Sequence, residues 1–220
     1  MKKMNVKTMV LLAMLAAVAF LLVTLVRIPV VLFLSYEPKD VVIAIGGVLL
    51  GPMASFVISL VVSLLEMFTI STTGPIGAVM NLLSSCTFAC TAAVIYKRKR
   101  TLGGAVLGLA AGSVAMVGIM LLWNYLITPL YMTGTSRSDV AAMLIPVFLP
   151  FNALKAGFNT ALTLMLYKPL VSALRHTGLV SSQPASTDAP KGQPKIGVYL
   201  IGAALLITCI LLLLVLQNKI

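Results

Sequence analysis

The sequence has few charged residues, and very few of them are acidic. Only 10% of its 220 residues are charged, with 5 acidic residues against 16 lysines and arginines. Hydrophobic residues make up 60% of the chain, which is more apolar surface than a soluble domain of this size can bury. Several apolar runs approach the length of about 20 residues that crosses a bilayer core. The composition therefore indicates a polytopic membrane protein, and no basic face with interleaved aromatics indicates nucleic-acid binding.

Several catalytic motifs are missing as well. The chain has no G-x-x-x-x-G-K-[ST] phosphate loop and no H-E-x-x-H pair, so ATP hydrolysis by the first route and zinc proteolysis by the second are excluded. Its single histidine, His176, follows an apolar segment, where it is interpreted as a solvated residue rather than the base of a serine nucleophile. The three cysteines, Cys86, Cys90 and Cys209, lie in apolar runs, which argues for packing and against a disulfide framework.

Seven apolar segments predict an all-α integral membrane protein. Their approximate bounds are 8–26, 40–51, 54–70, 77–96, 103–127, 147–173 and 196–216. Residues 40–70 form an almost continuous apolar stretch, but Gly51 followed by Pro52 interrupts helices strongly. This stretch is therefore predicted to be a hairpin of two short crossings rather than one long helix.

The basic residues predict the orientation in the membrane. Lys2, Lys3 and Lys7 place the N-terminus in the cytoplasm by the positive-inside rule, and the KRKR run at 97–100 should lie on the same side. An even number of crossings must then precede residue 97, as the predicted hairpin provides. The basic residues predicted outside are Arg27, Lys39, Arg137 and Lys219. Lys155 alone is left within the membrane.

Three regions are predicted along the chain. Residues 1–176 form a six-helix membrane domain, in which the first segment is a retained helix rather than a cleaved signal peptide, since its apolar run continues through Val26. Residues 177–195 are rich in Pro, Ser, Gln and Gly and predict a flexible cytoplasmic linker. Residues 196–220 contain one additional transmembrane helix.

Five polar residues from four segments are predicted to lie at one depth, in the outer half of the membrane. They are Glu66, Asn81, Asn124, Asn152 and Lys155. Pro150 suits the first turn of the sixth helix, which places Asn152 and Lys155 in its outer turns. Asn152, Lys155 and Asn159 are spaced i, i+3, i+7 and therefore share one helix face. Polar groups gathered at one depth favour a cavity open to the outside.

Other interpretations remain open from these residues alone. An asparagine such as Asn81 or Asn159 can join two membrane helices without binding a ligand. Glu66 and Lys155 can form an ion pair with each other, and a lysine near a helix end can extend to the membrane interface. Catalysis by Glu66 and Lys155 is a further alternative, although no nucleophile or metal site accompanies them.

A stripe of small residues marks the first segment. Ala13, Ala16 and Ala17 lie on one side of the predicted helix, and small residues at such spacing let two membrane helices approach closely. The stripe predicts either a docking face for another protein or packing within the chain.

Four stretches of the chain resemble a known family. They are LSYEPKDVVIAIGGVLLGP at 34–52, LLEMFTISTTGPIGAVMNLLSS at 64–85, WNYLITPLYM at 123–132 and LPFNALKAGFNTALTLMLYKPL at 149–170. In this order they resemble the riboflavin-specific substrate-binding subunit, or S component, of energy-coupling factor (ECF) transporters. The resemblance covers about residues 5–175, and its last stretch is the most specific.

The resemblance implies a six-helix fold whose loop 27–39 covers an outward-facing vitamin pocket. The flavin-binding positions fall on Asn124, Asn152 and Lys155, and the lid positions on Leu34 and Tyr36. The alanine stripe would dock on a membrane coupling (T) subunit, which two ATPase subunits drive. Riboflavin is the transported ligand and no cofactor is implied. The flat flavin ring could pack on Trp123, Tyr125 or Tyr36.

The sequence thus yields one main hypothesis and two alternatives. The main hypothesis is a high-affinity riboflavin-binding subunit of an ECF transporter in a bacterial cell membrane, with its N-terminus in the cytoplasm and Glu66 and Asn81 added to the site. The alternatives are a membrane enzyme that acts on a lipid, with Glu66 and Lys155 as acid and base, and a scaffold protein without a ligand.

Overall fold

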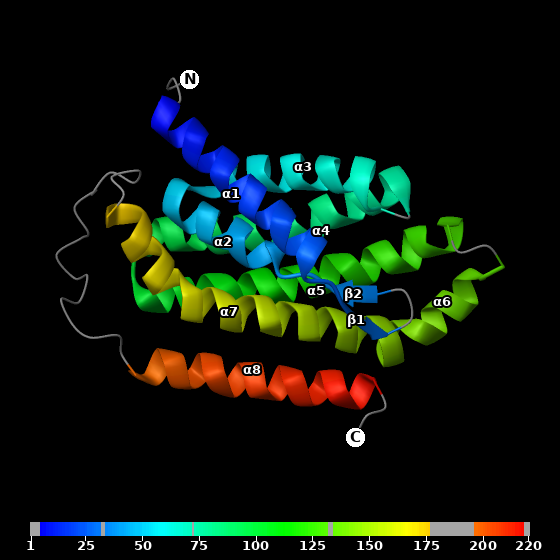
Figure 1. Cartoon of the computed structure of the whole chain (residues 1–220). Helices are drawn as coiled ribbons and strands as arrows, with labels where there is room; N and C mark the ends of the chain where they lie inside the picture. The colour runs from blue at the N-terminus through cyan, green and yellow to red at the C-terminus, as the bar shows by residue number, and fades with distance from the viewer. Residues whose placement is uncertain (1–4, 32–33, 72, 132–133, 177–195, 218–220) are drawn as a thin grey trace.

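The computed structural model describes residues 5–31, 34–71, 73–131, 134–176 and 196–217. The helices are α1 (Val6–Leu25), α2 (Lys39–Leu50), α3 (Pro52–Thr69), α4 (Gly74–Arg98), α5 (Leu102–Tyr131), α6 (Arg137–Met143), α7 (Leu149–His176) and α8 (Ile196–Leu216). A π-helical turn, η1 (Leu144–Phe148), joins α6 to α7, and two short strands, β1 (Ile28–Val31) and β2 (Leu34–Tyr36), join α1 to α2. Within these residues, 6 helical stretches are long and apolar enough to span a membrane. The prediction of an all-α membrane bundle with an extra C-terminal helix is confirmed (Figure 1).

The break between α2 and α3 falls where the sequence predicted it. Gly51 has a φ of 100°, a backbone conformation that residues with a Cβ rarely adopt. Pro52 follows as the first residue of α3, where its missing N–H leaves no helical hydrogen bond unmade. However, α2 has only 12 residues and is therefore about 18 Å long, well short of a bilayer core of about 30 Å. It does not cross the membrane by itself, contrary to the prediction.

A β-hairpin explains why α2 can be so short. β1 and β2 pair antiparallel, with Ile28 opposite Tyr36, in a segment that the sequence predicted only as a loop. Both Leu34 and Tyr36 are buried, so this hairpin folds inward and returns the chain at depth to the start of α2. Lys39 and Asp40 consequently begin α2 inside the bundle with no exposed surface. The assignment of Lys39 to an external loop is wrong.

The sixth membrane helix begins earlier than predicted. Ser136 and Asp139 form a reciprocal capping box that starts α6 ten residues before the expected start of the apolar run at residue 147. Pro150 is the second residue of α7 and thus lies in its first turn, as predicted, although α7 continues the helical path of α6 and η1. In η1 the Leu149 N–H bonds to the Leu144 carbonyl, a wider turn that accommodates the missing N–H groups of Pro146 and Pro150.

Small residues allow close packing between α4 and α5. A Cβ added at Gly112 would lie 2.5 Å from the Phe88 carbonyl oxygen, and one at Gly108 would lie 2.7 Å from that of Ala92. The two backbones are thus in contact through a glycine pair four residues apart, a common device in membrane helices.

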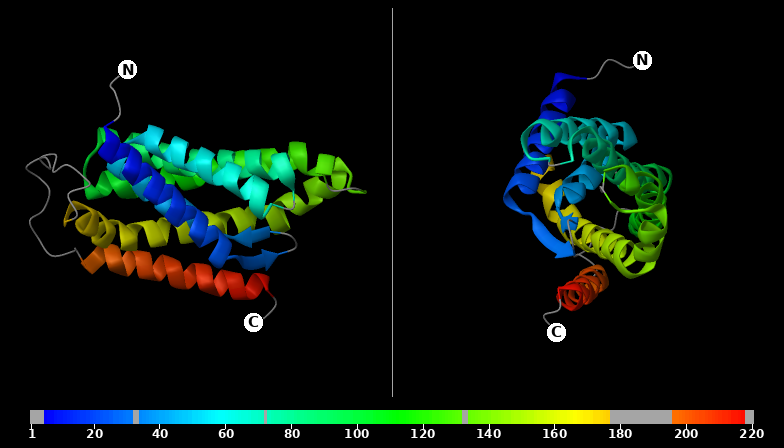
Figure 2. Two further views of the ribbon diagram at one scale, coloured as in Figure 1. Left: turned by 45° about the horizontal axis from the view of Figure 1, so that its top comes forward. Right: turned by 90° about the vertical axis from the view of Figure 1, so that its right-hand side faces the viewer.

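The extra helix α8 runs along α7 and reaches the β-hairpin (Figures 1 and 2). Cys209 of α8 is buried against Gly157 of α7, where a Cβ would approach its sulfur to 2.4 Å. Just beyond the C-terminal end of α8, the Gln217 side chain donates a 2.6 Å hydrogen bond to the Pro29 carbonyl. The predicted linker at 177–195 lies outside the described residues, so the division into three regions remains a prediction.

Candidate ligand-binding site

A cavity of about 340 Å³ opens beside the β-hairpin, among α3, α4, α5 and α7. Its volume is in the range of small-molecule sites. Its wall includes all five polar residues predicted to share one depth, together with Leu34 of the hairpin: Glu66, Asn81, Asn124, Asn152 and Lys155. The predicted convergence of these side chains is confirmed, whereas their contacts with a ligand remain a prediction.

The carboxylate of Glu66 belongs to a chain of alternating charges. Its Oε2 accepts hydrogen bonds of 2.6 Å from Lys39 and 2.6 Å from Asn81. Lys39 Nζ also lies 2.9 Å from Glu37, which in turn pairs with Arg27 at 3.0 Å. Glu37 and Arg27 line the cavity too. Arg27, whose side chain is partly exposed, is the last residue in this series of alternating charges. Glu66 is therefore neutralised by Lys39, and the alternative of an ion pair between Glu66 and Lys155 is wrong.

Lys155 has a different partner. Its ammonium lies 3.3 Å from Asp40 Oδ2 and donates to the Ser84 hydroxyl at 3.3 Å, while 7% of the residue is exposed. Asn152, on the same helix face, donates to the Phe148 carbonyl at 2.7 Å. The buried ammonium is thus stabilised by a charge on α2 and a hydroxyl on α4.

The two asparagines that are expected to contact a ligand are held by their own helices. Asn124 donates to the Met120 carbonyl at 2.8 Å, as Asn152 does to a carbonyl one turn back. Both are almost fully buried yet line the cavity. An amide in this position can exchange a bond to its own helix for one to a ligand at small net cost.

Tyr36 and Asn159 lie behind the cavity wall rather than in it. The Tyr36 hydroxyl donates to Asn159 Oδ1 at 3.1 Å, and its ring lies 4.9 Å from that of Phe158. Asn159 also donates to Asp40 at 3.2 Å. It therefore joins the hairpin, α2 and α7, as the interpretation of asparagine as interhelical glue expected.

The aromatic residues expected to pack on a flat ring are not in the described wall of the cavity. Trp123, Tyr125 and Tyr36 are absent from it, and Phe151 is the aromatic residue that lines it. Phe151 follows Pro150 on α7, one position before Asn152, inside the stretch quoted for its resemblance. Sequence reasoning missed it because an apolar residue in an apolar run carries no signal of its own.

The alanine stripe is divided between two environments. Ala13 and Ala17 are exposed on α1, whereas Ala16 is 6% exposed and belongs to the core. The expectation that all three form one docking face stays a prediction, and Ala16 is its buried member. Ala13 and Ala17 remain on an unpartnered side of the described bundle.

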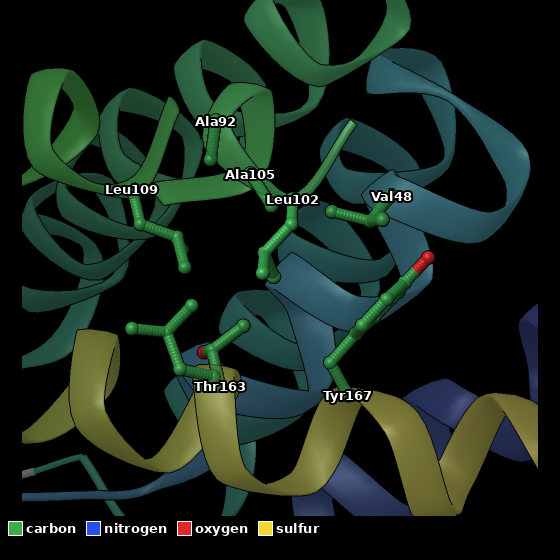
Figure 3. Close-up of a pocket in the computed structure, with 8 residues that line it drawn as sticks. Val48, Ala92, Leu102, Ala105, Leu109, Thr163 and Tyr167 are labelled. Atoms are coloured by element: carbon green, nitrogen blue, oxygen red, sulfur yellow. The ribbon is translucent and has the colours of Figure 1, made fainter. Parts of the chain in front are cut away.

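A second, much smaller crevice lies among α2, α4, α5 and α7 (Figure 3). Val48, Leu102, Leu109 and other apolar residues surround it, with Thr163 and Tyr167 of α7. Its volume of about 20 Å³ is room for roughly one water molecule. It is too small for an organic ligand, so the cavity beside the hairpin is the stronger candidate site.

Comparison with known proteins identifies the family. Residues 7–167 match the sequence profile described as "ECF transporter, substrate-specific component". The chain belongs to this family. It is thus a substrate-binding component of a transporter rather than a lipid-modifying enzyme. The matched region ends before α8, which lies beyond it.

Two curated bacterial proteins are similar over most of their length. The chain is 28% identical over 185 residues to "Riboflavin transporter RibU" of Staphylococcus aureus (strain TCH60), which covers 79% of this chain and 97% of that protein. It is 26% identical over 187 residues to "Riboflavin transporter FmnP" of Bacillus subtilis (strain 168), with 78% and 97% covered. A solved structure entitled "Structure and mechanism of the S component of a bacterial ECF transporter" superimposes with a TM-score of 0.63 at 29% identity, and covers 77% of this chain and 98% of that one.

Proposed function

We propose that this S component binds riboflavin in the cavity beside the hairpin and delivers it to an ECF transporter in a bacterial cell membrane. The observation that carries the proposal is the set of buried polar groups from four helices around one cavity, in a chain similar to two riboflavin transporters. A membrane bundle has little reason to keep such groups in its interior unless they bind one another or a ligand.

The chemistry of the wall suits a flavin. Riboflavin has a flat, largely apolar ring system with ring carbonyls, and a ribityl chain with several hydroxyls. Lys155, Asn124 and Asn152 offer ammonium and amide groups to these oxygens, while Phe151 and Leu34 offer apolar surface to the ring. Leu34 lies in the hairpin, which supports a lid role for residues 27–39.

The same proposal includes the orientation and the partners. The cavity faces outward and the N-terminus lies in the cytoplasm, which agrees with the basic run at 97–100 at the opposite end of α4 from Asn81. Ala13 and Ala17 on α1 meet a membrane coupling (T) subunit, and two ATPase subunits supply the energy. No phosphate loop occurs in this chain, so the energy must come from another chain.

Flavin binding is tested directly with the purified chain. Riboflavin titrated into the detergent-solubilised protein should lose its fluorescence on binding, with saturation at one flavin per chain. A titration indistinguishable from one with detergent micelles alone would reject the proposed function.

A further inference from the structure

Asp40 lies directly behind Lys155, away from the cavity. It has no exposed surface and is not part of the cavity wall, whereas Lys155 is. The two side chains meet at 3.3 Å, between Lys155 Nζ and Asp40 Oδ2. The ammonium is therefore located between a buried carboxylate on one side and the ligand space on the other.

The carboxylate of Asp40 is itself fixed in place by its neighbours. Its Oδ1 accepts a hydrogen bond from the Ser85 hydroxyl, and its Oδ2 accepts one from Asn159 at 3.2 Å. Asn159 is held in turn by the Tyr36 hydroxyl at 3.1 Å. Contacts from α4 and α7, and from the hairpin through Asn159, thus fix the position of the Asp40 carboxylate. The Lys155 ammonium that pairs with it is positioned in turn.

The second buried lysine is engaged elsewhere. Lys39 is the next residue in sequence, but its ammonium binds Glu37 at 2.9 Å and Glu66 at 2.6 Å. This leaves Asp40 as the carboxylate within ion-pair distance of Lys155 in the described bundle. A lysine ammonium has three N–H donors. Asp40 and Ser84 take two of them, so the third can point to a ligand in the cavity.

We propose that Asp40 is a positioning residue of the binding site, which acts on the ligand only through Lys155. This inference rests on the proposed flavin function. Without the carboxylate, the ammonium loses the charged partner that holds it, and its flexible four-carbon stem can turn away from the cavity wall. The ligand then loses a charge-assisted hydrogen bond although every residue that touches it is still present.

The test is a double-mutant cycle on riboflavin affinity with Asp40→Asn, Lys155→Met and the double variant. Loss of one hydrogen bond to a charged group corresponds to a weakening of roughly tenfold to a hundredfold. Each single variant is expected to fall in that range, and the double variant to bind no more weakly than Lys155→Met alone. Wild-type affinity in Asp40→Asn, or losses that multiply in the double variant, would overturn the inference.

Thermal stability, measured on the same samples, separates positioning from folding. Each single variant leaves one buried charge unpaired, whereas the double variant removes both, so its melting temperature should recover while its affinity does not. If Asp40→Asn is too unstable to titrate, Lys155→Met and the double variant still decide: equal affinity supports the inference and a further loss overturns it.

A control variant tests whether the loss of a negative charge elsewhere in the protein also weakens riboflavin binding. Asp139→Asn makes the same chemical change in the exposed capping box of α6 and should bind riboflavin as the wild type does. A wild-type chain that binds no riboflavin would reject the flavin function itself. A wild type that binds riboflavin, with Asp40→Asn equal to it, would reject only the role of Asp40.

Discussion

Lys39 is the side chain whose removal should harm the fold most. It is fully buried, and its ammonium is held by Glu37 at 2.9 Å and Glu66 at 2.6 Å. Lys39→Met keeps the length and the apolar stem but deprives two buried carboxylates of their shared cation. Breaking a buried pair by removing one partner destabilises by about 3–5 kcal/mol. For a chain of this size that corresponds to a fall of roughly 6–20 °C in melting temperature.

A second substitution distinguishes lost charge pairing from lost packing. Lys39→Met combined with Glu66→Gln removes the stranded acid on α3, while Glu37 keeps Arg27 at 3.0 Å. The double variant should therefore recover most of the lost melting temperature, which a packing defect would not allow. The assay is thermal unfolding of the detergent-solubilised chain, followed by intrinsic fluorescence or by loss of monomeric protein.

The matched control makes the same substitution at the surface. Lys97 is exposed near the end of α4, and Lys97→Met should change stability by no more than about 0.5 kcal/mol. A Lys39→Met variant that melts within about 2 °C of the wild type, like this control, would refute the charge-chain argument, since about 3 kcal/mol predicts at least about 6 °C.

Two further predictions concern the coupling face and the topology. Ala13→Leu with Ala17→Leu should leave riboflavin affinity unchanged and reduce uptake by the assembled transporter, because both residues are exposed and outside the described cavity wall. Ala16→Leu is the matched comparison, and it should lower the melting temperature because overpacking a core residue typically costs about 1–3 kcal/mol. A reporter fused after Arg100 should be accessible only from the cytoplasm, and one near Gly134 only from outside; reversed labelling would contradict the proposed orientation.

The sequence was informative where a local rule applies directly. Gly51 with Pro52 marked the turn between α2 and α3, because a positive φ and a missing N–H are properties of those residues themselves. Apolar periodicity and charge placed Glu66, Asn124 and Lys155 at one depth, and the cavity brings them together. Depth follows from counting residues along each helix, which requires no knowledge of neighbours.

The partners of the buried charges could not be predicted in the same way. Lys39 and Asp40 stand at the boundary between a polar stretch and an apolar run, where charged residues are usually solvated. Only the inward course of β1 and β2 places them at the depth of Lys155, and that course depends on tertiary contacts of Leu34 and Tyr36. The early start of α6 was missed for a related reason, since a short capped helix rich in small and polar residues resembles a loop.

Most of the few acidic residues in the chain lie around the cavity. Of the 5 acidic residues in the chain, Glu37, Asp40 and Glu66 are all buried around it. Each is paired with a cation, so the charges alternate from Arg27 through Lys39 and again from Asp40 to Lys155. Well-packed apolar residues would often stabilise such an interior as well or better. The acids are therefore explained by the cations they neutralise, and under the proposed flavin function Lys155 is explained by a ligand that needs a donor.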